Sequence, residues 1–145
     1  MSDVVRIERL LKHPLERVFE FFSKEERLMS WFGPEGLHVT EGSLAFENQS
    51  SWFSVMTNGE GQRYKVSGQV TSFNAPTSIG FTWGWHDEQD NRGDESFVLV
   101  EFEAVSASET RLKLSHSDIS DQATRDSHAQ GWNSSLNSLE PALAA

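Results

Sequence analysis

The sequence predicts an α+β protein in which a curved antiparallel sheet of about seven strands wraps around one long C-terminal helix. Three observations predict this fold. Residues 4–11 alternate apolar and charged side chains, as a strand does. Residues 37–117 continue in alternating runs that turn residues separate, for example at 58–61 and 87–93. Residues 121–140 then change to apolar spacings of three and four, which indicate a helix with one covered face.

Two short helices are expected after the first strand. Pro14 suits a first helical turn, where its missing N–H would have no partner anyway, and the apolar residues of 18–22 follow at near-helical spacing. The segment 23–26, Ser-Lys-Glu-Glu, has the form of a capping box and predicts that a second helix begins there. Gly33 and Pro34 are expected to end that helix.

One strand of the predicted sheet carries all its large side chains on one face. In the run 78–86, Ile79, Phe81, Trp83 and Trp85 share one parity, and the other parity holds Gly, Thr, Gly and His. Because side chains alternate across a strand, the four large residues should all point into the core.

The next strand is ambiguous. Between residues 97 and 105 both parities are largely apolar, but Glu101 and Glu103 share the parity of Phe97 and Leu99. Either face of this strand could therefore be the inward one.

The C-terminal helix is expected to lie over the sheet with one apolar stripe, until Pro141 interrupts it. Gly131 lies within this helix and lowers its propensity by about 1 kcal/mol relative to Ala, so its small size is expected to allow close packing. The stripe consists of His128, Trp132, Leu136 and Leu139.

Composition narrows the function classes. The 145 residues fit a single domain, 1–145. Twelve Lys and Arg against 22 Asp and Glu give a net charge of −10, which argues against nucleic acid and anionic membrane as partners. There is no cysteine, no signal-peptide pattern and no long apolar run, so a cytoplasmic protein is expected.

The sequence contains no motif for a nucleotide, a cofactor or a catalytic nucleophile, and the spacing of its five histidines predicts no metal site. His86 stands in an acidic turn that lacks calcium-loop spacing, so a solvated turn is expected. His116 and His128 come near the end of the last strand and the start of the helix. They are either polar anchors or proton-transfer groups at a cavity, or capping and packing residues, and the second interpretation is favoured.

The large aromatic residues either line a pocket or fill a core, since large rings do both. A core position is favoured for Phe81 and Trp83. For Trp31 and Phe32, before a Gly-Pro turn, a pocket rim or partner surface competes equally with burial. The other rings in question are Trp52, Trp85 and Trp132.

Three segments carry a resemblance to a known family: LMSWFGPEG at 28–36, FTWGW at 81–85 and RDSHAQGWNSSLNSL at 125–139. In this order and spacing they resemble the homologues of the activator of heat-shock-protein-90 ATPase, within the START-like (SRPBCC) helix-grip superfamily. The resemblance implies a helix-grip fold with a cavity between the sheet and the C-terminal helix, in a superfamily that binds lipids, sterols and polyketides. It implies no defined reaction.

The leading hypothesis is therefore non-catalytic binding of a small apolar or aromatic ligand in that cavity, by a monomer or a homodimer without a cofactor. A chaperone-associated, stress-related interaction protein is an alternative. A cyclase- or hydratase-like enzyme that uses His116, His128, Tyr64 or Glu101 is another. The residues predicted to bind the ligand are Trp31, Phe32, Trp52, Tyr64, Trp83, Trp85, Glu101, His116, His128 and Trp132.

Overall fold

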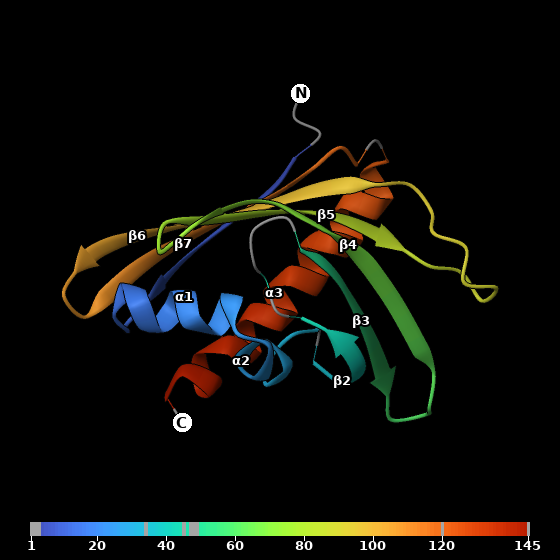
Figure 1. The fold of residues 1–145 in the computed structure, drawn as a ribbon, viewed down its shortest axis with the longest axis horizontal. Helices are drawn as coiled ribbons and strands as arrows, with labels where there is room; N and C mark the ends of the chain where they lie inside the picture. The colour runs from blue at the N-terminus through green and yellow to red at the C-terminus, as the bar shows by residue number, and fades with distance from the viewer. Residues whose placement is uncertain (1–3, 34, 45, 47–49, 120, 145) are drawn as a thin grey trace.

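A computed structural model describes residues 4–33, 35–44, 46, 50–119 and 121–144. Seven antiparallel strands form one curved sheet in the order β1-β7-β6-β5-β4-β3-β2 (Figure 1). The elements are β1 (Val5–Leu11), α1 (Leu15–Ser23), α2 (Glu25–Met29), β2 (Leu37–Ser43), β3 (Ser51–Asn58), β4 (Arg63–Asn74), β5 (Ser78–Trp85), β6 (Ser96–Ser106), β7 (Glu109–Ser117) and α3 (Gln122–Ala144).

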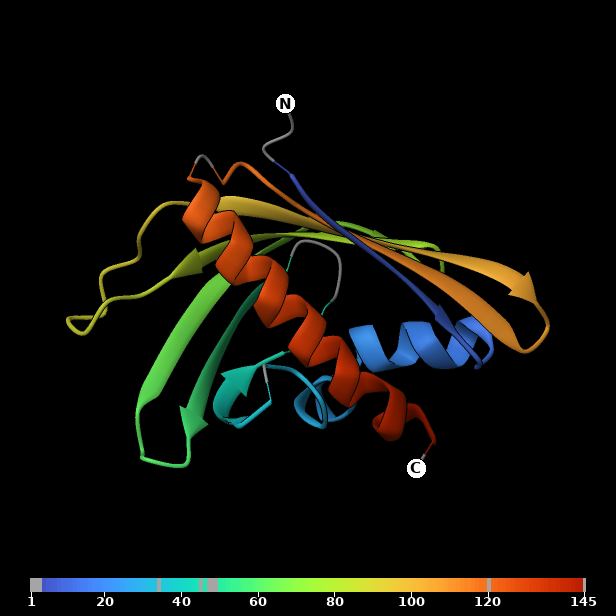
Figure 2. The same ribbon diagram turned by 180° about the vertical axis from the view of Figure 1, so that it is seen from behind.

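All three helices lie on one side of the sheet. Seen from behind, α3 crosses the sheet diagonally, with α1 and α2 beside its C-terminal half (Figure 2). The core lies between the helices and the sheet, where aromatic rings meet edge to face, for example Phe19 and Phe102 with ring centroids 5.3 Å apart. The predicted fold class is confirmed: this is the helix-grip arrangement.

The strand patterns place the inward face of the sheet. On β5, Ile79, Phe81 and Trp83 are buried as predicted, whereas Trp85 at the end of the strand stays 36% exposed. On β6 the inward parity is that of Val98, and Glu101 faces outward. The ambiguity of β6 is thereby resolved, since a sheet face covered by helices cannot take the glutamates without desolvating them.

The predicted capping box is wrong. Ser23 is the last residue of α1, and its hydroxyl donates to the carbonyl of Phe19 at 3.0 Å. The residue that precedes α2 is Lys24, which makes no side-chain cap. Glu25, at the start of α2, instead accepts the backbone N–H of Leu44 at 2.9 Å, so its carboxylate joins the helix to the residue that follows β2.

The C-terminal helix does not end at Pro141, as the sequence suggested. It runs on to Ala144 with the proline inside it. Leu143, beyond the proline, is buried, and the Nε and Nη2 atoms of Arg17 donate to its carbonyl at 2.9 and 2.6 Å. Burial of the leucine and these two bonds stabilise a last turn that local propensity alone would disfavour.

Among the described residues, no helix is long and apolar enough to span a membrane.

Candidate ligand-binding site

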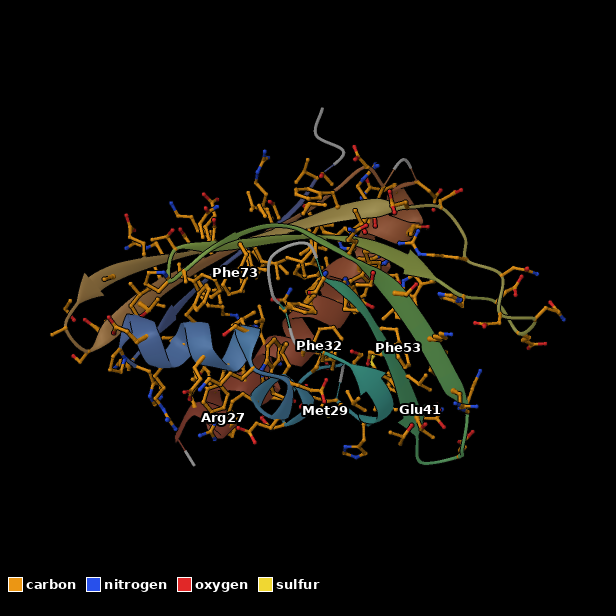
Figure 3. The ribbon with its side chains drawn as sticks, in the orientation of Figure 1. Arg27, Met29, Phe32, Glu41, Phe53 and Phe73 are labelled. Carbon is orange, nitrogen blue, oxygen red and sulfur yellow. The ribbon has the colours of Figure 1, made fainter. Side chains whose placement is uncertain are left out.

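A cavity of about 200 Å³ lies between α3, β5 and the segment that follows α2. Phe32, from that segment, lies on the inner side between α3 and the sheet (Figure 3). The cavity is lined by Phe32, Gly33, Met56, Trp83, Trp85, Ser127, His128, Gly131, Trp132 and Ser135.

Aromatic rings from three separate elements form the cavity wall. The Trp83 ring of β5 lies 5.1 Å from the Trp132 ring of α3 and 6.1 Å from the ring of Phe32, measured between centroids. Trp52 of β3 packs behind them, 5.5 Å from Trp83. These tilted contacts join the rings into one continuous apolar wall on one side of the pocket.

A chain of hydrogen bonds fixes this wall from the sheet side. Trp132 Nε1 donates to His116 Nδ1 at 3.0 Å, so the hydrogen of the neutral imidazole is on Nε2. His116 Nε2 then donates to Ser96 Oγ at 2.6 Å, and Ser96 Oγ donates to the carbonyl of Trp83 at 3.3 Å. Both nitrogens of His116 are therefore engaged, and each donor in the chain has an acceptor.

His116 is fully buried, and this sets its charge. Burial, with a smaller contribution from the neighbouring His128, lowers the pKa of His116 from 6.5 to about 3. The imidazole is thus neutral at physiological pH. A neutral ring can accept the hydrogen bond from Trp132, which an imidazolium could not do.

A second tryptophan–histidine bond closes the same region from the helix side. Trp85 Nε1 of β5 donates to His128 Nε2 at 3.0 Å, and His128 Nδ1 donates to the carbonyl of Thr124 at 2.8 Å. The His116 and His128 rings lie 4.8 Å apart. Two hydrogen bonds therefore join helix and sheet. Trp132 of α3 donates to His116 of β7, and Trp85 of β5 donates to His128 of α3.

The predicted site residues fall into three groups. Phe32, Trp83, Trp85, His128 and Trp132 line the cavity. Trp31, Trp52 and His116 are buried in the shell around it, and Trp31 Nε1 donates to the carbonyl of Phe21 at 2.9 Å. Tyr64 and Glu101 lie elsewhere: Tyr64 is 37% exposed on β4, and Glu101 is exposed on the outward face of β6.

Five lining residues were not predicted: Gly33, Met56, Ser127, Gly131 and Ser135. Three of them carried a signal in the sequence. Ser127, Gly131 and Ser135 are spaced by four, so they form a stripe of small residues on one face of α3. Small residues on a helix face that covers a sheet leave space, and here that space is the cavity.

Comparison with known proteins assigns the family. The family model described as "Activator of Hsp90 ATPase homolog 1-like protein" (AHSA1) matches residues 12–144. The chain belongs to the AHSA1 family.

Several solved structures resemble this AHSA1 protein. The AHSA1 protein from Silicibacter pomeroyi is 47% identical, with 97% of each chain covered and a TM-score of 0.92. A protein from Chromobacterium violaceum has 20% identity and a TM-score of 0.87, with 100% of this chain and 99% of that chain covered. A protein from Arthrobacter aurescens has 19% identity and a TM-score of 0.89, with 99% and 87% covered. None of the curated proteins matches the chain.

The polar groups of this AHSA1 protein indicate what the site can do. In the part of the chain that the structure describes, no group of three or more His, Asp or Glu side chains could hold a metal ion. Of the four residues considered for an enzymatic role, only His128 lines the cavity, and both of its nitrogens are hydrogen-bonded. General acid–base catalysis needs a nitrogen within reach of the substrate, and both nitrogens of His128 already have partners within the protein.

Proposed function

We propose that the protein binds one small apolar or aromatic molecule in the cavity between α3 and the sheet, without transforming it. One observation carries this proposal: a half-open pocket with about 200 Å³ of free volume lies against tryptophan and phenylalanine rings. An apolar molecule that enters such a pocket removes apolar ring surface from water and gains contacts with it.

The volume limits the size of the ligand. Typical pockets for drug-sized molecules have volumes of roughly 300–1,000 Å³, and an apolar cavity of roughly 150 Å³ accommodates benzene. A cavity of about 200 Å³ therefore suits one substituted ring or a small bicyclic ring system. A sterol or a full acyl chain would need the helix to move.

The few polar groups on the wall also limit ligand chemistry. Ser135 Oγ already donates to the carbonyl of Gly131 at 2.9 Å, and His128 is engaged at both nitrogens. A ligand that carries a charge would lose its hydration without gaining a counter-ion from these groups. Neutral rings such as indole or naphthalene are the appropriate probes.

The test is a titration of the protein and of matched variants with naphthalene and 1-naphthol, in which tryptophan fluorescence reports binding. Gly131→Leu places a large side chain on the cavity wall, while Gln130→Leu adds the same side chain at the exposed neighbouring position. We expect at least tenfold weaker binding by Gly131→Leu and unchanged binding by Gln130→Leu. Equal affinity in both variants would place the bound probe outside this cavity, and no binding by the wild type would contradict the proposal.

A second candidate function follows from the family itself, whose description names an activator of the Hsp90 ATPase. The net charge of −10 suits a basic patch on a protein partner. We propose this interaction as the alternative to ligand binding. Stimulation of a purified Hsp90 ATPase by this protein would support it, and an unchanged ATPase rate at saturating protein would count against it.

A further inference from the structure

A second polar cluster lies on the outer face of the sheet, away from the ligand cavity. On β4, Val66 points into the core, so its neighbours Lys65 and Ser67 point outward. The segment after β5 continues beside β4, since the backbone N–H of His86 donates to the carbonyl of Lys65 at 2.9 Å. The segment then folds back on itself through an isolated bridge between His86 and Arg92. The sheet thereby gathers Ser67, His86 and Asp90 from two segments, and nothing in the proposed ligand binding uses them.

His86 lies between the other two side chains. Its Nε2 forms a 2.7 Å hydrogen bond with Ser67 Oγ, whereas its Nδ1 lies 2.8 Å from Asp90 Oδ1 in an ion-pair contact without hydrogen-bond geometry. The His86 side chain is only 12% exposed, so the imidazole is packed between these two groups. A hydroxyl hydrogen-bonded to a base, with a carboxylate beside that base, is the set of groups that activates a nucleophile.

The turn before Asp90 is shaped to present its carboxylate. Asp87 Oδ1 accepts the backbone N–H groups of Gln89 and Asn91, both at 2.9 Å. Asp90 itself has φ +64°, in the left-handed region that costs a non-glycine residue about 1 kcal/mol or more. The closed turn therefore holds the Asp90 carboxylate beside His86.

Neighbouring cations set the charges in this cluster. Lys65 Nζ lies 3.1 and 3.4 Å from the two oxygens of Asp90, and together with His86 it lowers the pKa of that carboxyl. Asp90 is therefore a carboxylate at neutral pH, which favours the hydrogen on His86 Nδ1 and leaves Nε2 to accept from Ser67.

Arg92 lies against the same hydroxyl. Its Nε donates to Ser67 Oγ at 3.1 Å, its Nη2 to the carbonyl of Ser67 at 2.9 Å and its Nη1 to Glu95 at 3.1 Å. Room for the guanidinium exists because residue 84 is glycine: a Cβ there would lie 2.5 Å from Arg92 Cζ. The cation thus stands where negative charge on the serine oxygen would develop.

We propose that Ser67, His86 and Asp90 form a nucleophile, its general base and its positioning carboxylate, and that Ser67 is acylated by small activated esters. An open groove lined in part by Phe53, Tyr64 and His86 runs beside the cluster and offers apolar surface to the acyl or leaving group. This inference is independent of the proposed ligand binding.

The reaction balances within these groups. Ser67 Oγ attacks the ester carbonyl carbon while its proton passes to His86 Nε2. His86 then gives that proton to the leaving oxygen as the acyl–oxygen bond of the ester breaks, so an alcohol or phenol departs and His86 is neutral again. Water then attacks the acyl-serine with His86 as base. The acyl–oxygen bond to Ser67 breaks, the proton returns to Ser67, and a carboxylic acid leaves.

The decisive experiment is labelling of the wild-type protein with a fluorophosphonate probe, which releases fluoride as it phosphonylates an activated serine, followed by peptide mapping. We expect the label on Ser67, at least tenfold above that on Ser72, a serine of the same strand without a histidine partner. Labelling no greater on Ser67 than on Ser72 overturns the proposal, and this comparison needs no variant to fold.

Four variants distinguish a chemical role from a structural one. Ser67→Ala abolishes the label and the hydrolysis of p-nitrophenyl acetate, whereas Ser72→Ala keeps both. Asp90→Asn slows labelling at least tenfold without moving the thermal unfolding midpoint, and Asp90→Glu recovers part of the rate, as expected for a residue that positions the base. Equal labelling rates in Asp90→Asn and the wild type would refute the role of the carboxylate.

Discussion

The buried His116 makes a quantitative prediction about stability and pH. Its pKa is about 3 in the folded protein against 6.5 for an unperturbed histidine. Between pH 6.5 and pH 3 the unfolded chain therefore binds a proton at His116, whereas the folded protein does not. Stability from this group is fully present above pH 6.5 and is lost progressively as the pH falls from 6.5 towards 3.

The loss of unfolding free energy follows from how far the pH lies below the pKa of the unfolded chain. At pH 5.0 the solution is about 1.5 pH units below the unfolded pKa, and each unit corresponds to about 1.4 kcal/mol. The wild type should therefore lose about 2 kcal/mol of unfolding free energy through His116 alone between pH 7.5 and pH 5.0.

The assay is urea unfolding at both pH values on the wild type and on two variants. His116→Gln removes the titrating group but keeps an acceptor for Trp132 and a donor for Ser96. The decrease in its unfolding free energy between pH 7.5 and pH 5.0 should therefore be about 2 kcal/mol smaller than in the wild type. Trp132→Phe removes one hydrogen bond but keeps His116, so it should be less stable at both pH values with the wild-type pH dependence. If the unfolding free energy of His116→Gln depended on pH as that of the wild type does, His116 would not be the group that causes the dependence.

Three further predictions concern the fold. Gly68→Ala should destabilise the protein by about 3 kcal/mol or more, or prevent folding, because the new Cβ would lie 1.9 Å from the backbone oxygen of Thr82; soluble yield and chemical unfolding measure this. Phe102→Ala should cost about 3–5 kcal/mol and Glu101→Ala less than about 0.5 kcal/mol in urea unfolding, and the reverse order would contradict the inward face assigned to β6. Arg17→Ala should speed amide hydrogen exchange in the last turn of α3, since it removes two hydrogen bonds to that turn; unchanged exchange there would show that leucine burial alone holds it.

The strand patterns predicted the fold because period-two alternation reports directly which face is buried. It succeeded on β5, where small and large residues alternate without exception. It left β6 open because both parities were apolar, and only the position of the helices decided the inward face.

Local signals were less reliable where tertiary contacts compete with them. The hydroxyl of Ser23 bonds back into α1 and not forward into α2, and α3 continues through Pro141 because Leu143 is buried beyond it. At Ser23 the competing contact is local, since Phe19 is only four residues earlier. At Pro141 the contacts that hold the last turn come from residues distant in sequence, and no pattern in a short window contains them.

The sequence predicted the aromatic and histidine residues of the candidate site. It did not predict which of their atoms form hydrogen bonds with one another. Aromatic parity and helix spacing brought Trp83 and Trp132 to one place. The pairing of His116 with Ser96 depends on the register between β6 and β7, which a single sequence does not specify. Similarly, the cluster of Ser67, His86 and Asp90 joins a residue of β4 to a turn after β5. The sequence of that turn alone predicted only a solvated acidic turn, because it does not show that Ser67 lies beside it.

Native mass spectrometry of the purified protein shows whether the cavity beside α3 holds a small apolar molecule. We expect one equivalent of a small neutral compound, either co-purified or taken up from added naphthol, that is released on denaturation and is absent from Gly131→Leu. A bare protein mass that stays unchanged when naphthol is added in excess would contradict it.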